Sequence, residues 1–211
     1  NTKIDFSKKI YESSIDPLLR FFHEVDIKPC SWVKIAKKYC DKNIPAQTRC
    51  NIDITCEYTQ IKPIEKTSIA PLLVASFDIE CTSCDGSFPN ASRESDQIIQ
   101  IGTTFHRYGS KDCHIKHIVT LKDCGQIKED ENIIQESYQT EKEVLLAWVK
   151  LIKDTDPDII TGYNIWGFDF SYIYDRARCL FKNEKGDYST TLLEMLSRNV
   201  EKPAKFIEKK L

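Results

Sequence analysis

The chain has 211 residues, with 30 Lys and Arg against 32 Asp and Glu, so its formal net charge at pH 7 is -2. This balance excludes the strongly basic composition that would by itself indicate nucleic-acid binding. No segment has the roughly 20 consecutive apolar residues of a membrane-spanning helix and the start lacks a signal-peptide core, so we expect an intracellular protein whose nine cysteines are reduced thiols.

The first 70 residues are the least informative part of the chain. Basic residues outnumber acidic ones there, and aromatic residues alternate with lysines. Such a pattern can stack bases and contact phosphates, but it more often reflects an aromatic core beneath solvated lysines. The aromatic residues are Phe21, Phe22, Trp32 and Tyr39. The stretch from Pro63 to Pro71 has the composition of a boundary, so we expect one domain over residues 1–70 and another over 71–211.

An apolar run from Leu72 to Phe77 predicts a buried strand that ends in two acids, Asp78 and Glu80. Side chains two residues apart in a strand point to the same face, so the two carboxylates lie together while Ile79 points the other way. Two like charges this close favour a divalent cation such as Mg²⁺ or Mn²⁺ between them. The alternative is a strand end that emerges into solvent.

The segments that follow predict an α/β domain. Two further strands are expected over residues 98–105 and 115–121. Thr140 and Glu143 have the spacing of a capping box that opens a helix, and a short strand is expected at 159–161. Cys81 and Cys84 form a Cys-x-x-Cys pair, which can bind zinc or exchange disulfides, but without a second such pair we interpret them as coincidental loop thiols.

Asp169 begins another predicted helix. Phe170, Ile173, Ala177 and Leu180 recur at helical spacing after it, so Asp169 lies in the first turn of an amphipathic segment. An acid at this position is favoured by the helix dipole alone. Spacing therefore leaves two interpretations of Asp169, a helix-terminal charge or a metal ligand.

Three sets of residues resemble the family-B DNA polymerases, especially their delta-type replicative members. The segment from Asp156 to Ile165, followed by Phe168 and Asp169, is similar to the second exonuclease motif of that family. The first motif is matched by residues 76–81, 88–89 and 96–101. The N-terminal domain of the same enzymes is resembled by residues 11–16, 19–22 and 30–32.

The resemblance implies a ribonuclease-H-like exonuclease core, here incomplete, with a smaller mixed α+β N-terminal domain. It implies a proofreading 3′→5′ exonuclease that uses four acids and a tyrosine on two magnesium or manganese ions, within a DNA-directed DNA polymerase. Asp78, Glu80 and Asp169 match three of the acids, with catalytic and metal-binding roles. Asn164 and Phe168 match positions near the primer 3′ end.

The fourth acid and the tyrosine belong to a third motif, Tyr-x-x-x-Asp, which we do not expect within this chain. Tyr58 and Tyr172 do not fit it, and the ending from Lys205 to Leu211 looks like the approach to the next exonuclease segment. We therefore expect a fragment that cleaves poorly by itself. The alternative is a noncatalytic segment that binds nucleic acid or acts as a scaffold.

The partners that the resemblance implies are primer-template DNA, single-stranded DNA, the other polymerase domains and, through regions outside the chain, a sliding clamp. It also implies that the protein acts in the nucleus or at a viral replication site in the cytoplasm.

Overall fold

The computed structural model describes residues 14–40, 45–127, 132–181, 192, 196–200 and 204. The stretches 11–13 and 205–211, which entered the predictions above, lie outside the described residues. The chain divides into two compact units, residues 1–68 and 69–211, whereas the sequence placed a boundary after residue 70.

The first unit is small and mixed. Helix α1 (Pro17–Val25) is capped by Asp16, whose carboxylate accepts the N–H of Leu18 at 2.8 Å and so satisfies a free helical donor. Strands β1 (Val33–Lys34) and β2 (Lys62–Pro63) pair antiparallel, and two 3-10 turns, η1 (Lys37–Tyr39) and η2 (Tyr58–Gln60), complete the unit.

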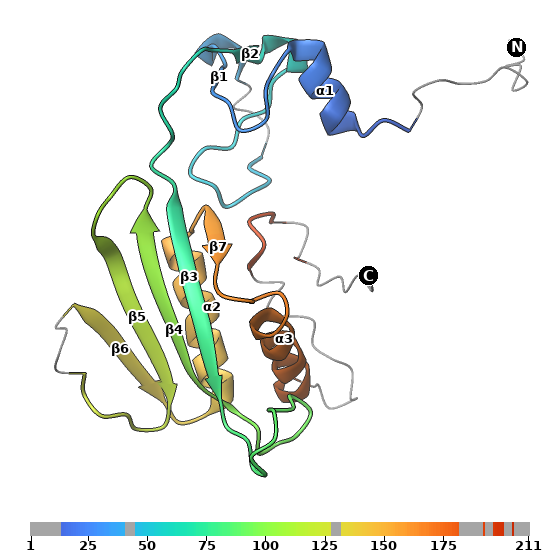
Figure 1. Ribbon diagram of the computed structural model, residues 1–211. Coiled ribbons are helices and arrows are strands. Elements are labelled where there is room, and N and C mark those ends of the chain that lie inside the picture. Colours follow the sequence, from blue (N-terminus) through green and yellow to red (C-terminus); the bar gives the residue numbers. More distant parts are fainter. Residues whose placement is uncertain are drawn as a thin grey trace, which may run out of the picture. The chain divides into compact units, whose positions relative to one another are not determined.

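The second unit is built on a five-stranded sheet with the order β6-β5-β4-β3-β7 (Figure 1). Strands β3, β4 and β5 form an antiparallel meander, while β6 joins β5 and β7 joins β3 in parallel. The bounds are β3 (Leu73–Cys81), β4 (Ile98–Arg107), β5 (Cys113–Leu121), β6 (Ile133–Tyr138) and β7 (Ile159–Thr161). The expected strands are confirmed, but β6 was missed.

Two helices complete this unit, α2 (Glu141–Thr155) and α3 (Asp169–Leu180). Figure 1 shows α2 crossing one face of the sheet and α3 next to the arrowhead end of β3. Strand β3 alternates buried and accessible residues, and its buried Phe77 packs against Trp148 of α2 and Phe170 of α3, with ring centroids 4.9 and 5.0 Å away. These contacts form the core of the predicted mixed α/β fold, which is confirmed.

Helix α2 begins where the sequence predicted. Thr140 accepts the N–H of Glu143, and the Glu143 carboxylate accepts the N–H of Thr140, which is the reciprocal bonding of a capping box. Within the described part of the chain, no helix has the length and apolar character needed to cross a membrane.

Candidate functional site

The two edges of strand β3 differ along its length. Strand β4 pairs with β3 throughout, whereas β7 pairs only with Val74 to Ser76 on the other edge. At Gly162 the chain leaves β7 and passes so close to β3 that a Cβ atom there would lie 2.5 Å from the carbonyl oxygen of Phe77. Only glycine allows this approach without a shift of backbone. The edge of β3 beyond Ser76 is thereby left without a described strand partner.

Helix α3 brings Asp169 to this unpaired edge. The Asp169 carboxylate accepts the backbone N–H of Ile79 at 3.1 Å, so a side chain takes the place of a neighbouring strand. Asp169 is only 2% exposed, although it is an acid in the first turn of its helix. The contact places Asp169 beside the stretch of β3 that carries Asp78 and Glu80.

Asp78 lies next to Asp169, and their negative charges repel each other. Burial raises the pKa of Asp169, and the negative charge of Asp78 and a side-chain hydrogen bond with it raise that pKa further, while the Ile79 N–H opposes the rise. Among the described residues, no Lys, Arg or His forms an ion pair with either carboxylate. No cation of the described residues therefore compensates the negative charge of this pair.

Glu80 lies on the same accessible face of β3 as Asp78, as the strand alternation predicted. Their Cα atoms are about 7 Å apart along the strand, because the rise is about 3.4 Å per residue. Within the described ranges, no group of three His, Cys, Asp or Glu side chains is close enough to hold a metal ion. The structure thus brings Asp78 and Asp169 together and places Glu80 on the strand face of Asp78, but it does not join Glu80 to the pair.

The loop before Asp169 is shaped by Asn164 and Gly167. Asn164 has a φ of 52°, and its carbonyl accepts the N–H groups of Gly167 at 2.9 Å and Phe168 at 3.1 Å. A Cβ at Gly167 would lie 2.3 Å from the Asn164 side-chain oxygen, so the absence of a side chain lets the amide fold over this turn. Asn164 is exposed within the tight turn that leads into the helix of Asp169.

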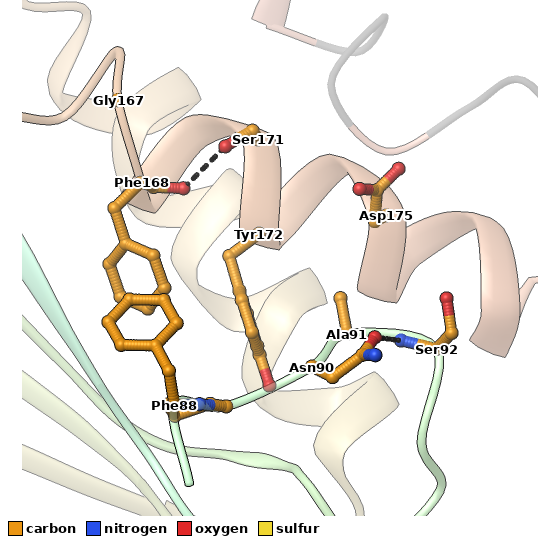
Figure 2. Close-up of a pocket in the computed structure, with 10 residues that line it drawn as sticks. Phe88, Asn90, Ala91, Ser92, Gly167, Phe168, Ser171, Tyr172 and Asp175 are labelled. Atoms are coloured by element: carbon orange, nitrogen blue, oxygen red, sulfur yellow. Dashed lines mark hydrogen bonds between the residues drawn. The ribbon is translucent and has the colours of Figure 1, made fainter.

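Phe168 belongs to a pocket next to this turn. Its ring lies 5.1 Å from that of Phe88 and 5.2 Å from that of Tyr172, between centroids. Figure 2 shows the Phe88 and Phe168 rings against each other, with Tyr172 pointing from α3 toward the 88–92 segment. The pocket has a volume of about 410 Å³ and is lined by Phe88, Pro89, Asn90, Ala91, Ser92, Gly167, Phe168, Ser171, Tyr172 and Asp175.

Phe88 and Tyr172 line this pocket, although the sequence did not indicate either of them as a site residue. Phe88 is 75% exposed although it is aromatic, and it belongs to the residues that match the first motif, which was an available signal. Tyr172 is buried and donates its hydroxyl to the carbonyl of Asp96 at 2.9 Å. That contact joins α3 to the loop after β3, and nothing local in the sequence indicates it.

Asp96 is buried beneath the loop between β3 and β4 and binds its backbone. Its carboxylate accepts the N–H groups of Asn90 at 2.9 Å and Cys84 at 3.3 Å, and these bonds lower the pKa of Asp96 against the opposing effect of its burial. Cys84 is exposed and Cys81 is half-buried, and burial raises the pKa of the Cys81 thiol to about 12. A thiol that stays protonated is a poor nucleophile and a poor zinc ligand.

The spacing of the third motif does occur once in the sequence, at Tyr108 and Asp112, a pair that is not among the candidate tyrosines named above. The structure places this pair in the hairpin between β4 and β5. The N–H of Tyr108 bonds to the carbonyl of Leu72 at 2.8 Å, so it lies at the opposite end of β3 from Asp78. These two residues do not complete the acidic site.

Comparisons with known proteins agree on one family. A family model described as the exonuclease domain of DNA polymerase family B matches residues 8–210. The DNA polymerase of Acanthamoeba polyphaga mimivirus is 43% identical over 82% of this chain, and the DNA polymerase delta catalytic subunit of Arabidopsis thaliana is 38% identical over 82%. The matched regions are 10% and 16% of those two proteins, so the chain spans a small part of its relatives.

A solved structure supports the fold. The family B DNA polymerase from the archaeon Pyrobaculum calidifontis matches 81% of this chain and 18% of its own, with a TM-score of 0.53 and 21% identity. With the family match, this likeness supports the ribonuclease-H-like exonuclease fold that the motifs predicted.

Proposed function

The chain belongs to the exonuclease-domain family of the family B DNA polymerases, and from this premise we propose that it forms part of a proofreading 3′→5′ exonuclease within a DNA-directed DNA polymerase. The exonuclease domains of this family are metal-dependent nucleases. The substrate of the proposed site is the 3′ end of a DNA primer. Its reaction releases a nucleoside monophosphate as water attacks phosphorus and the bond to the 3′ oxygen breaks.

One observation carries the proposal, the placement of Asp169 against the Ile79 N–H beside Asp78. Two neighbouring carboxylates that form no ion pair with a Lys, Arg or His in the described part of the chain have the donor chemistry that Mg²⁺ and Mn²⁺ prefer. We assign Asp78, Asp169 and Glu80 as the residues that would hold the metal ions. Glu80 is accessible on the strand face of Asp78, so its side chain has room to turn toward the other two acids by a change of rotamer.

Divalent ions held by these residues would activate the attacking water and stabilise charge on the leaving oxygen. The protein itself positions the substrate and the carboxylates. We assign Asn164 and Phe168 to the primer 3′ end, because the exposed turn of Asn164 and the ring of Phe168 adjoin the helix start of Asp169. The remaining acid and the tyrosine of the family site are not assigned to any described residue.

Three of the four acids of the family site are assigned among the described residues, and this number leads to an expectation about metal affinity and rate. We expect the chain to bind one ion more tightly than the second and to hydrolyse DNA slowly. Primer-template DNA, single-stranded DNA and the other polymerase domains are its proposed partners, with a sliding clamp reached through those domains. The proposed place of action is the nucleus or a viral replication site.

The test is a titration of the 211-residue chain with Mn²⁺, in which the electron paramagnetic resonance signal of the free ion measures binding. We expect Asp78→Ala and Asp169→Ala to weaken Mn²⁺ binding strongly. The matched control is Asp158→Ala, which removes an aspartate that also accepts an N–H of β3. Equal Mn²⁺ affinity in all four proteins would refute the metal site.

A second measurement separates the enzyme from a noncatalytic segment. Release of nucleotides from a mismatched primer end should be slow, dependent on Mn²⁺ and lost in Asp78→Ala. DNA binding that is unchanged by Mn²⁺ and by Asp78→Ala, with no nucleotide release, would favour the scaffold. Rapid hydrolysis by this chain, lost in Asp78→Ala, would instead show that the described acids suffice.

A further inference from the structure

Helix α3 carries a second buried charge on the side of Asp169. Arg176 follows Asp169 by seven residues, which is two helical turns, so the two side chains leave the same side of the helix. Arg176 is 2% exposed. An arginine is rarely buried to this extent unless every part of its guanidinium has a partner.

The guanidinium of Arg176 contacts two different parts of the chain. Its Nε donates to Glu141 Oε1 at 2.8 Å and its Nη2 donates to Glu141 Oε2, which is the two-pronged pairing of arginine with a carboxylate. Its Nη1 donates to the carbonyls of Ala91 at 2.9 Å and Arg93 at 2.8 Å. Arg176 thereby joins α3 to the start of α2 and to the loop that carries Phe88.

Glu141 extends these contacts to the sheet. Its Oε1 also accepts the N–H of Ile98 at 2.9 Å. The pairing of β3 with β4 changes register here, because Glu80 faces Gln100 whereas Cys81 faces Ile98. This irregularity is a β-bulge, and bulges next to functional sites direct neighbouring side chains. The Glu141 carboxylate therefore satisfies backbone at the bulge directly after Glu80.

The pair formed by Arg176 and Glu141 thus holds three segments next to the proposed site. They are the helix of Asp169, the end of β4 that pairs with β3 at the bulge after Glu80, and the loop of Phe88. A buried ion pair gives little net stability compared with well-packed apolar residues, because both charges lose their hydration. A requirement for geometry explains its presence at this point better than a requirement for stability.

We propose that Arg176 and Glu141 are positioning residues of the acidic site, which set the separation of Asp169 from Asp78 and Glu80. The inference rests on the proposed metal-dependent function, which it deepens. Neither residue touches substrate or metal in this scheme. They act through the backbone segments that they hold, and their effect should appear in the affinity for divalent cations.

The decisive variant is Arg176→Lys. Lysine keeps the positive charge but cannot donate to both carboxylate oxygens and two carbonyls at once. Removal of such supporting contacts lowers metal affinity by about 10–100-fold in characterised sites. We expect the dissociation constant of Arg176→Lys for Mn²⁺ to rise by this factor.

The chain offers a matched control in Arg198. This arginine donates to Asp156 Oδ1 at 2.8 Å and to the carbonyls of Asp156 at 3.1 Å and Pro157 at 2.9 Å. It therefore makes the same kinds of contact, but next to the start of β7, away from the acids. Arg198→Lys should leave Mn²⁺ affinity unchanged.

The experiment measures Mn²⁺ binding to the 211-residue chain by electron paramagnetic resonance, with Asp78→Ala as the reference for loss of the site. Circular dichroism establishes that each variant is folded. If Arg176→Lys does not fold, Glu141→Gln replaces it, because the glutamine can still accept the Ile98 N–H while losing its charge. A weakened site in Arg176→Lys or Glu141→Gln, and not in Arg198→Lys, supports the proposal.

Two other outcomes overturn different claims. If the unmodified chain binds Mn²⁺ and Asp78→Ala does not, equal affinities in Arg176→Lys and Arg198→Lys show that the buried pair is only structural. If the unmodified chain itself fails to bind Mn²⁺, the proposed metal function fails, and the positioning role fails with it.

Discussion

At each end of strand β3 an aspartate side chain accepts a backbone N–H of the strand, but the charges next to the two aspartates differ in sign. Asp158 accepts the N–H of Leu73 at 2.8 Å at one end, and Asp169 accepts the N–H of Ile79 at 3.1 Å at the other. Asp158 has Arg198 as an ion-pair partner at 3.7 Å. Asp169 instead lies beside Asp78, and the repulsion contributes to its raised pKa. An aspartate that served only to satisfy the strand backbone would not need a second acid next to it.

The largest expected difference between the two ends concerns their arginines. Arg176→Met would leave Glu141 buried and unpaired, which destabilises a protein by about 3–5 kcal/mol. Arg198→Met would break an ion pair whose side chains are 37% and 42% exposed, and such pairs contribute about 0–1 kcal/mol. The free energy of unfolding in urea measures both. Equal losses would mean that the two ends are held in the same way.

The second prediction concerns Gly162, where the chain crosses from one end of β3 to the other. Gly162→Ala would place a methyl group 2.5 Å from the Phe77 carbonyl oxygen and 2.3 Å from the Ile165 side chain. Such overpacking costs about 1–3 kcal/mol and would move the turn that precedes Asp169. The melting temperature and the affinity for Mn²⁺ should both fall.

Gly102→Ala is the control for that substitution. Gly102 pairs with Asp78 across the strands, yet a Cβ there would meet no atom within 4 Å. Alanine is better than glycine in a strand interior by about 0.5–1 kcal/mol, so this variant should be as stable as the unmodified chain or slightly more so. A loss of stability at Gly102 equal to that at Gly162 would contradict the account of the close crossing.

Local patterns in the sequence predicted most elements of this region but none of the contacts that join them. The alternation after Leu72 placed Asp78 and Glu80 on one face, and the capping box placed the start of α2, because both signals lie within a few residues. Strand β6 was missed because it is an edge strand whose residues are mostly half-accessible, so its apolar alternation is weak.

The contacts of the buried charged residues were also not predictable from local sequence patterns. Glu141 and Arg176 are 35 residues apart, and each appears in its helix as one more charge of an amphipathic sequence. Helical spacing predicted that Asp169 begins a helix, but not that its carboxylate reaches the N–H of Ile79. Contacts of this kind depend on how elements pack, which periodicity within one element does not determine.

The third prediction compares the two aspartates directly. Asp169→Asn keeps an oxygen for the Ile79 N–H and removes the repulsion with Asp78, so it should raise stability at pH 7 by about 1 kcal/mol, or about 2–4 °C in melting temperature. Asp158→Asn loses its attraction to Arg198 and should be neutral or slightly destabilising. Differential scanning calorimetry without divalent cations measures both. A destabilised Asp169→Asn would indicate that this carboxylate is structural like Asp158.

The smallest expected effect is the change with pH in the stability difference between Asp169→Asn and the unmodified chain. Between two neighbouring pH values, only a fraction of the full difference appears. The folded pKa of Asp169 lies above its ordinary value of 3.8, so the folded chain holds a proton that the unfolded chain releases. Asp169 therefore penalises folding increasingly as pH rises from about 4 through the raised pKa, and the penalty is constant above it. The melting temperature of Asp169→Asn minus that of the unmodified chain should be near zero below pH 4 and should grow toward neutral pH. Mn²⁺ should shrink this difference at pH 7, because a bound cation compensates both carboxylates. A difference that is flat with pH, or that Mn²⁺ leaves unchanged, would place Asp169 in the same electrostatic setting as Asp158.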